Sequence, residues 1–290
     1  MNITLPDGSI RELDLGSTGL DLASSIGPGL AKAAIAVTVN GVQRDLSDPI
    51  NEDSSVSIIT IDSDEGLEIM RHTLTAQVLA RAVKNLYPGT KLAIGPTITD
   101  GFYYDFEFKK PISPEDLESI EKEMKKIIAG NSSITKSFHT KEEAINVFRN
   151  EGESYKESIV SDSQQEDNFQ LYTQDDSEFV DLCRGPHLPN LKHIGAFKLT
   201  KLAGAYWKGD SKNKMLTRIY GTAWKNEKDL NAHLHTIEEA EKRDHRKLGK
   251  EMNLFHFQEE APGMVFWHPD GWTIYRLSLI HISEPTRRRG

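Results

Sequence analysis

The stretch Phe179-Val-Asp-Leu-Cys-Arg-Gly-Pro-His-Leu-Pro-Asn190 constrains the fold more than any other part of the sequence. It contains the only cysteine of the chain, Cys183, and His187 follows four residues later. A Gly-Pro pair lies between them, and proline inside a helix lacks an amide hydrogen and clashes with the preceding turn. We therefore expect a strand over 179–182 that runs into a tight loop carrying a thiol, a guanidinium and an imidazole. A free cysteine is most often a small buried apolar residue, and that interpretation of Cys183 stays open.

The segment that follows this loop is strongly basic. From Arg184 to Lys225 it contains nine basic residues and one acidic residue, a net charge of +8 in a chain with an overall charge of −9. Aromatic residues alternate with the basic ones, as expected for a surface that binds a single-stranded nucleic-acid end. A solvated lysine face over an aromatic core explains the residues alone equally well. The residues predicted to contact RNA are Arg184, Lys198, Lys201, Tyr206, Trp207, Lys208, Lys214 and Arg218.

The composition is that of a globular chain of 290 residues, long enough for more than one domain. One cysteine excludes an internal disulfide framework and fits the reducing cytoplasm. The first residues lack the basic and apolar parts of a signal peptide. No segment reaches the roughly 18 apolar residues of a membrane span. We therefore expect a cytoplasmic protein with no membrane contact.

The order of short strands and helices predicts an α+β fold with several domains. Extended segments, the turn dipeptide Asn40-Gly41 and one helix predict a small β-grasp domain at the N-terminus. A larger α+β domain follows and begins with a helix from about Glu68 to Leu86. The predicted parts are a β-grasp domain at 1–62, an α+β domain at 63–225, a charged linker helix at 226–254, the start of a further domain at 255–276, and an atypical tail at 277–290.

Short motifs are spread in order from Met1 to about Arg276. They are Thr4-Leu-Pro-Asp-Gly-Ser9, Ile26-Gly-Pro-Gly-Leu-Ala-Lys32, Gly101-Phe-Tyr-Tyr-Asp105, Gly152-Glu-Ser-Tyr-Lys156, Asp181-Leu-Cys-Arg-Gly-Pro-His187, Gly204-Ala-Tyr-Trp-Lys-Gly-Asp210, Gly221-Thr-Ala-Trp224, Arg243-Asp-His-Arg-Lys247 and Glu260-Ala-Pro-Gly-Met-Val-Phe-Trp-His268. Together they resemble the threonyl-tRNA synthetase family. The resemblance implies a TGS domain, an editing domain that hydrolyses mischarged seryl-tRNA(Thr), a linker helix and the first strands of a class II catalytic domain.

An editing activity also has an independent chemical reason. Serine is threonine without one methyl group, so it fits any pocket that is built for threonine. One methyl group in a pocket discriminates by only about 1–3 kcal/mol. A second, hydrolytic site removes the mischarged product.

The family's editing site combines a His-x3-His helix with a Cys-x3-His loop. The loop is intact here as Cys183 and His187, whereas the helix departs from the pattern. Alignment places Thr73 and Gln77 at the two histidine positions, with His72 one residue early. At about 100° per residue, Thr73 and Gln77 share a helix face and His72 is rotated away from it. Hydrolysis needs a deprotonated water, and neither threonine nor glutamine is a base at neutral pH.

Two further residues match positions that are associated with the family's editing site. The resemblance implies that Lys156 holds the terminal ribose and that Asp181 holds the substrate amine. A surface lysine and a loop-capping aspartate are equally good interpretations. The four editing positions also resemble the zinc site of the related alanyl-tRNA editing proteins. Because two of the four are replaced, we expect no metal in this site.

The resemblance also implies cofactors and partners. The sequence ends before the class II signature motifs, so we expect no cofactor in this chain and no ligation of threonine by it. The full-length enzyme would use ATP, Mg and Zn, with threonine and ATP as substrates and tRNA(Thr) as partner. The family's dimer contact lies mainly in the catalytic domain. We therefore expect a monomeric fragment and a homodimeric full-length enzyme.

Two main hypotheses follow for the chain itself. In the first, the editing domain hydrolyses seryl-tRNA through Cys183, His187, Lys156 and His72. In the second, the same fold binds the tRNA acceptor end and has lost hydrolysis; the altered Thr73 and Gln77 positions favour it, and the intact loop opposes it. A regulatory RNA-binding protein that uses the TGS domain alone is a weaker third hypothesis.

Overall fold

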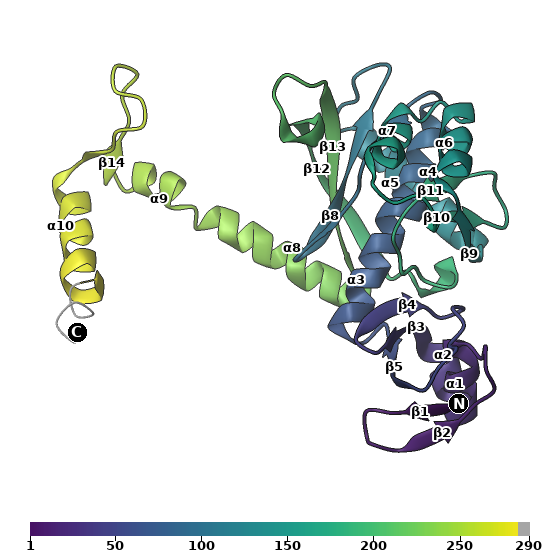
Figure 1. The fold of residues 1–290 in the computed structure, drawn as a ribbon. Coiled ribbons are helices and arrows are strands. Elements are labelled where there is room, and N and C mark those ends of the chain that lie inside the picture. Colours follow the sequence, from purple (N-terminus) through teal and green to yellow (C-terminus); the bar gives the residue numbers. More distant parts are fainter. Residues whose placement is uncertain (284–290) are drawn as a thin grey trace. The chain divides into compact units, whose positions relative to one another are not determined.

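The computed structural model describes residues 1–283. Contacts divide the chain into a first unit, Met1–Leu230, and a second unit that begins at Asn231. Helices and mainly antiparallel sheets alternate along the chain (Figure 1), so the predicted α+β class is confirmed. In the described part of the chain, no helix has both the length and the apolar character to cross a membrane.

The N-terminal domain is a five-stranded sheet in the order β2-β1-β5-β3-β4, accompanied by two helices. Its hairpins are made by turn residues with positive φ. Gly8 lies between β1 and β2, and Asn40 with Gly41 lies between β3 and β4, as a type I′ turn requires. The elements are β1 (Asn2–Thr4), β2 (Ile10–Glu12), α1 (Gly19–Ile26), α2 (Pro28–Ala33), β3 (Ala34–Val39), β4 (Val42–Asp45) and β5 (Ser54–Thr60).

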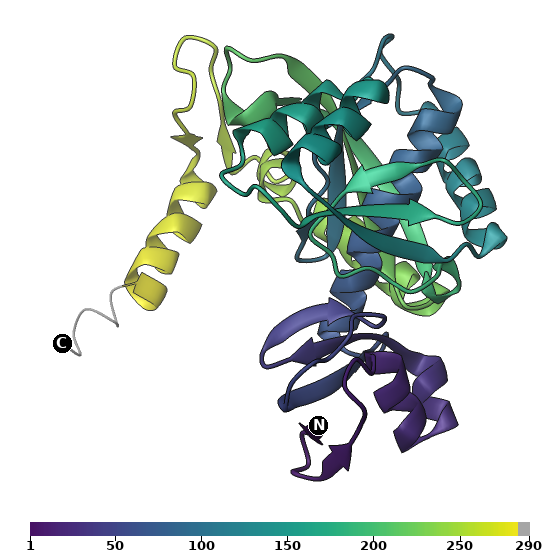
Figure 2. The same ribbon diagram turned by 45° about the vertical axis from the view of Figure 1, so that its right-hand side comes forward.

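One long helix leads from this sheet into the second domain (Figures 1 and 2). Ser63 caps its start by accepting a hydrogen bond from the Gly66 amide. The helix is α-helical as α3 (Asp64–Thr73), π-helical as η1 (Leu74–Leu79) and α-helical again as α4 (Ala80–Leu86). The sequence predicted a regular helix here, and the π-helical segment was not predicted. Such segments are rare and often mark functional sites.

A second sheet packs against this helix. Its strands have the order β12-β13-β8-β6, and β7 also pairs with β8; every pairing is antiparallel. The elements are β6 (Lys91–Leu92), β7 (Thr97–Ile98), β8 (Gly101–Glu107), α5 (Asp116–Gly130), η2 (Leu191–His193), β12 (Ala196–Tyr206), η3 (Trp207–Gly209) and β13 (Met215–Trp224).

A third, three-stranded sheet has the order β11-β10-β9. Its strand β11 confirms the strand predicted at 179–182, and the Cys183 amide still donates to the Gln170 carbonyl before the chain leaves the sheet. The loop then turns through Gly185 and Pro186, so the predicted strand-to-loop transition is confirmed. The elements are β9 (Ile134–His139), α6 (Lys141–Asn150), α7 (Ser154–Asp162), β10 (Phe169–Gln174) and β11 (Val180–Leu182).

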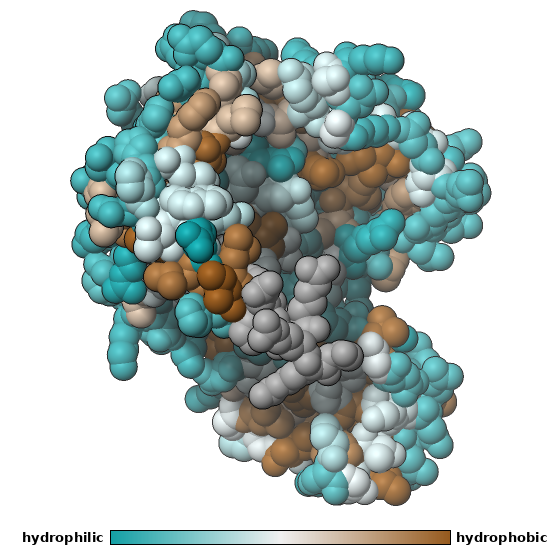
Figure 3. All heavy atoms as spheres, turned by 90° about the vertical axis from the view of Figure 1, so that its left-hand side faces the viewer, coloured by the Kyte–Doolittle hydropathy of each residue, from teal (hydrophilic) through white to brown (hydrophobic). Residues whose placement is uncertain are grey.

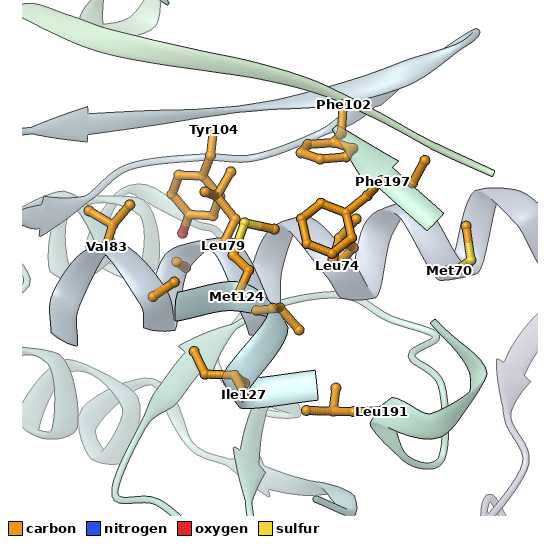
Figure 4. Packing of buried hydrophobic residues seen from close by; sticks show 14 of the residues in the cluster. Met70, Leu74, Leu79, Val83, Phe102, Tyr104, Met124, Ile127, Leu191 and Phe197 are labelled. Atoms are coloured by element: carbon orange, nitrogen blue, oxygen red, sulfur yellow. The ribbon is translucent and has the colours of Figure 1, made fainter. Parts of the chain in front are cut away.

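The core of the second domain surrounds the π-helical segment. All six residues of η1 are buried. Figure 4 shows Leu74 and Leu79 on the long helix, with Phe102 and Tyr104 of β8 on one side and Met124 of α5 on the other. Buried apolar area is the main source of stability, so the unusual helix geometry is held in place by the packing around it.

The second unit begins inside α8 (Glu227–Lys242) and continues with α9 (His245–Glu251), β14 (Phe255–His256), β15 (Phe266–Trp267), α10 (Pro269–Ser278) and η4 (Leu279–Ser283). The prediction of one linker helix over 226–254 is wrong, because α8 ends at Lys242 and Asp244 starts α9 by accepting the Arg246 amide. Figure 3 shows hydrophobic side chains exposed among hydrophilic ones on the face drawn there. Of the predicted tail at 277–290, residues 284–290 lie outside the described part of the chain.

Candidate functional site

The loop after β11 borders a cavity of about 970 Å³ in the second domain. Residues from α3, α7, β8 and β11 line it, including His72, Tyr104, Lys156, Asp181, Cys183 and Arg184. Gly95 also lines it, and a Cβ there would lie 2.2 Å from the Tyr104 ring. Four of the five residues that the sequence predicted for catalysis therefore line the cavity, and the fifth, His187, stacks behind His72.

His72 and Cys183 are in direct contact. The distance from His72 Nε2 to Cys183 Sγ is 2.8 Å, which is a hydrogen bond between an imidazole and a thiol. The sequence placed His72 off the helix face that carries Thr73 and Gln77, and the structure brings His72 into contact with the loop from that position. The loop passes across two adjacent faces of the helix, so that Cys183 contacts His72 while His187 contacts the next residue, Thr73.

The π-helical segment alters the regular helix geometry on which the sequence prediction was based. It begins one residue after Thr73, and Gln77 lies inside it. A π-turn closes over five residues where an α-turn closes over four. In the family pattern the two histidines are four residues apart, whereas His72 and Gln77 are five residues apart. A π-turn accommodates this one additional residue within the helix. The offset was visible in the sequence and was the one signal that could have revealed the segment.

The Thr73 hydroxyl determines which nitrogen of His187 carries the proton. Thr73 Oγ1 donates to the Ile69 carbonyl (2.9 Å) and accepts from the Leu188 amide (3.0 Å). It lies 3.1 Å from His187 Nδ1. A hydroxyl has one proton, already directed at Ile69, so Nδ1 must be the donor in this contact. His187 Nε2 is buried with no hydrogen-bond partner within the described residues.

The two histidine rings stack on each other. Their centroids are 4.7 Å apart and their planes differ by 4°. Burial lowers the pKa of His72 below its usual value, while the nearby Asp181 carboxylate acts in the opposite direction. His72 is therefore neutral at physiological pH and can accept a proton.

His72, Cys183 and His187 together are also a candidate metal site. One ligand atom each from His72, Cys183 and His187 lie within 4.8 Å of one another. In a tetrahedral zinc site, bonds of about 2.0–2.3 Å hold sulfur and nitrogen ligands roughly 3.5 Å apart. The 2.8 Å contact of His72 with Cys183 is shorter, and the parallel rings do not converge on one point. The geometry is that of a hydrogen-bonded pair.

Lys156 and Asp181 form an ion pair at the wall of the cavity. Lys156 Nζ lies 2.6 Å from Asp181 Oδ1, and both side chains are buried. Burial raises the pKa of Asp181, and the lysine opposes that shift. Neither residue has the exposed, unpaired character of a surface lysine or a simple loop cap. Removing one partner of such a pair typically costs about 3–5 kcal/mol, because the other charge stays buried.

The predicted RNA-contacting residues lie close to acidic side chains from other segments, so the net positive charge around them is smaller than the sequence segment alone suggests. Acids from other segments pair with four of the cations: Lys198 with Glu121, Lys208 with Asp162, Lys214 with Glu107, and Arg218 with Asp105. Tyr206 is exposed, and Trp207 packs against Tyr155. Within residues 1–283, Arg184 and Lys201 form no ion pair, and Lys201 lies over the Tyr220 ring. Counting charge along the chain overlooked the acids of α5, α7 and β8.

Sequence reasoning missed three residues around the site. Tyr104 lines the cavity, and its hydroxyl is buried without a hydrogen-bond partner in the part of the chain that is described. Tyr172 packs edge-on against the His187 ring at 4.4 Å. Asp45, from the N-terminal domain, accepts the backbone amide of His187 at 2.7 Å. Tyr104 lies in the motif Gly101-Phe-Tyr-Tyr-Asp105, which did not reveal its role, and no motif contains Tyr172 or Asp45.

Comparison with known proteins agrees with this architecture. Residues 1–60 match the TGS domain, and residues 170–220 match the "Threonyl and Alanyl tRNA synthetase second additional domain". Threonine--tRNA ligase of Hahella chejuensis is 54% identical over 286 residues, 99% of this chain and 44% of that protein. The chain corresponds to the N-terminal part of a threonine--tRNA ligase. The family resemblance predicted from the motifs is thereby confirmed.

Other threonine--tRNA ligases give the same result. That of Maricaulis maris is 54% identical over 290 residues, 100% of this chain and 44% of its own length. That of Prochlorococcus marinus is 52% identical over 282 residues, 97% of this chain and 44% of its own length. The chain thus spans less than half the length of these ligases. Asp181, Cys183 and His187 lie within the residues that match the second additional domain, whereas His72 and Lys156 precede them.

Proposed function

We propose that this chain binds the acceptor end of tRNA(Thr) and hydrolyses mischarged seryl-tRNA(Thr). The observation that carries the proposal is the 2.8 Å contact between His72 and Cys183 at the wall of the cavity, with the His187 ring stacked behind. It supplies a neutral imidazole where the sequence pattern alone left a threonine and a glutamine. General bases of this kind contribute about 10²–10⁴-fold to a rate.

The reaction needs water, an ester and a proton acceptor. Water attacks the carbonyl carbon of the seryl ester, and His72 accepts the proton that the water loses. The bond between that carbon and the ribose oxygen then breaks, and the proton passes from His72 to the ribose oxygen. The products are serine and uncharged tRNA. The Tyr104 hydroxyl, at the cavity wall beside Asp181, would donate to the negative oxygen that the carbonyl carries between these two steps.

The ion pair of Lys156 and Asp181 would orient the substrate. Its carboxylate is the acceptor available for the serine amine, and its ammonium group is the donor available for the ribose. Their pairing at 2.6 Å pre-organises both groups before the substrate enters. Arg184, exposed at the cavity wall, and Lys201, over Tyr220, would meet the tRNA backbone.

A second route uses the thiol as nucleophile. Cys183 Sγ would attack the ester carbon and pass its proton through His72 to the ribose oxygen, leaving a seryl thioester that water then hydrolyses. The same 2.8 Å contact favours it, since a nucleophile and its base lie within hydrogen-bonding distance in such pairs. Acid-quenched mass spectrometry of the protein detects the thioester if this route operates.

A tRNA-binding module without hydrolysis is the alternative function. Gln77 favours it, because the side chain is fully buried and its amide nitrogen has no partner among the described residues. The glutamine side chain is not a base at neutral pH, so it cannot take the proton from the attacking water. This alternative predicts tRNA binding by the chain without loss of the seryl group.

The test is deacylation of seryl-tRNA(Thr) by the 290-residue chain and by His72→Ala, Cys183→Ala, His187→Ala and Gln77→His variants. We expect hydrolysis by the parent chain and a loss of about 10²-fold or more in the His72→Ala variant. The Cys183 and His187 variants should also lose activity.

Binding of uncharged tRNA(Thr), measured in parallel, serves as the control and should change little in these variants. No hydrolysis by the parent with binding intact, and a gain in the Gln77→His variant, would establish the binding module instead.

The full-length enzyme is proposed to attach threonine to tRNA(Thr) in the cytoplasm, with ATP, Mg and Zn. Those groups belong to the catalytic domain, which lies outside this chain in the family pattern. The site described above requires none of them for the hydrolytic step.

A further inference from the structure

We infer that Asp45 of the N-terminal domain is a positioning residue of the hydrolytic site in the second domain. The inference rests on the proposed hydrolysis and goes beyond it, because the TGS domain becomes part of the site. Asp45 is the last residue of β4, and its side chain is buried. It touches no reacting atom and acts through His187.

Both carboxylate oxygens of Asp45 contact the second domain. Oδ1 accepts the backbone amide of His187 at 2.7 Å. Oδ2 accepts the Tyr172 hydroxyl at 2.7 Å. Tyr172 in turn packs edge-on against the His187 ring. The carboxylate therefore fixes the backbone of His187 and one wall of its ring together.

A buried lysine joins the same carboxylate. Lys136 Nζ, from β9, lies 2.8 Å from Asp45 Oδ2 and 2.6 Å from Asp48 Oδ2. Three separate segments of the second domain thus converge on one end of β4. Charge-assisted hydrogen bonds in a buried setting are short and directional, so they define position more tightly than apolar contact does.

The loop is shaped to admit this contact. Gly185 has a φ of +64°, and a Cβ there would lie 2.1 Å from the Tyr172 hydroxyl and 3.7 Å from Asp45 Oδ2. Only glycine fits so close to the pair. From Gly185 the chain reaches His187 in two residues, and its Nδ1 meets Thr73. His187 is therefore held by three contacts: its backbone amide donates to Asp45, its ring packs against Tyr172, and its Nδ1 contacts Thr73.

The experiment compares Asp45→Ala and Asp45→Asn in the 290-residue chain. Alanine leaves the His187 amide without an acceptor, whereas asparagine keeps an oxygen for it. Misplacement by about 1 Å can cost on the order of 10²-fold in rate. We expect kcat for seryl-tRNA deacylation to fall by about 10²-fold in Asp45→Ala with KM little changed, and Asp45→Asn to restore most of that loss.

Cys183 provides a second readout that does not depend on hydrolysis. It is the only cysteine of the chain, so its alkylation by iodoacetamide reports on this loop alone. We expect the alkylation rate to rise in Asp45→Ala and to stay near the parent rate in Asp45→Asn. If the parent chain does not hydrolyse seryl-tRNA, the proposed function fails, while the alkylation rates still test the role of Asp45.

Two control variants separate position from stability. Asp53 is an exposed acid of the same domain that accepts only the Asn2 amide, and Asp53→Asn should match the parent in every assay. Lys136→Met removes the buried cation but leaves the contact between Asp45 and His187. It should lower the unfolding temperature and keep the parent alkylation rate. Equal effects of Lys136→Met and Asp45→Ala on kcat and alkylation, or no effect of Asp45→Ala on either, would overturn the inference.

Discussion

Thr73 has one hydroxyl proton and two lone pairs, and the site uses all three. The proton goes to the Ile69 carbonyl, and the lone pairs accept from the Leu188 amide and from His187. A residue that cannot act as a base thereby fixes which ring nitrogen of His187 faces the helix. Thr73, at a histidine position of the family pattern, therefore holds a histidine of the loop in place.

The pH dependence of hydrolysis tests the role of His72. Only the neutral imidazole accepts a proton, and burial lowers the pKa of His72 below the usual 6.5. We therefore expect kcat to stay level as the pH falls from 8 to 6.5, and to drop about tenfold per unit only below the lowered pKa. Single-turnover rates between pH 5 and 8, corrected for the spontaneous hydrolysis of the ester, measure this. A midpoint above 6.5 would contradict the assignment of His72 as the proton acceptor.

At the scale of elements, the π-helical segment is the feature that regular patterns could not foresee. The apolar periodicity of Ile69, Val78, Leu79 and Val83 predicted a helix, and the structure confirms one. This periodicity does not reveal the additional residue of the π-helical segment, because all six residues of η1 are buried and none marks an exposed face. The strand and loop around Cys183 were predictable because Gly-Pro excludes a helix there. Contacts such as His187 with Asp45 were not, since they join residues 142 positions apart.

Deleting Thr75 tests whether the π-helical segment is a tolerated insertion. Removing one residue allows η1 to become a regular α-turn while α3 and α4 keep their positions. The change removes the hydrogen bond from the Thr75 hydroxyl to the Arg71 carbonyl, worth about 1 kcal/mol. We expect the free energy of unfolding in urea to fall by roughly 1–2 kcal/mol, with contact between His72 and Cys183 retained.

The matched control is deletion of Ala82, a buried residue of the regular helix α4. That deletion rotates the following side chains by about 100°, and it should cost more than about 4 kcal/mol. Equal losses in the two deletion variants would show that η1 is a required part of the fold and not an absorbed insertion.

At the scale of the molecule, the chain carries two domains of a longer family pattern. The curated relatives are more than twice as long, and their remaining part holds the ligase chemistry in the proposed full-length enzyme. In the second unit, Trp267, Trp272 and Tyr275 are each 40–48% exposed. We infer that further parts of the full-length enzyme cover them.

We expect this 290-residue chain to be a monomer in solution. The family's dimer contact lies mainly in the catalytic domain, and this chain matches 44% of the length of its relatives. Sedimentation velocity at micromolar concentrations measures the state directly. A stable dimer there would show that this chain contains a self-association surface of its own.

The contact between Asp45 and His187 also bears on how such proteins can be recombined. A TGS domain is usually pictured as a module that evolution can exchange freely between proteins. Here an incoming module would have to bring an acid at the end of its fourth strand, and the recipient would have to keep Tyr172 and Gly185 to receive it. If Asp45 has the role inferred above, a graft that lacked the acid would fold as a TGS domain and still slow hydrolysis in its neighbour. The two domains would then have to be exchanged as a pair.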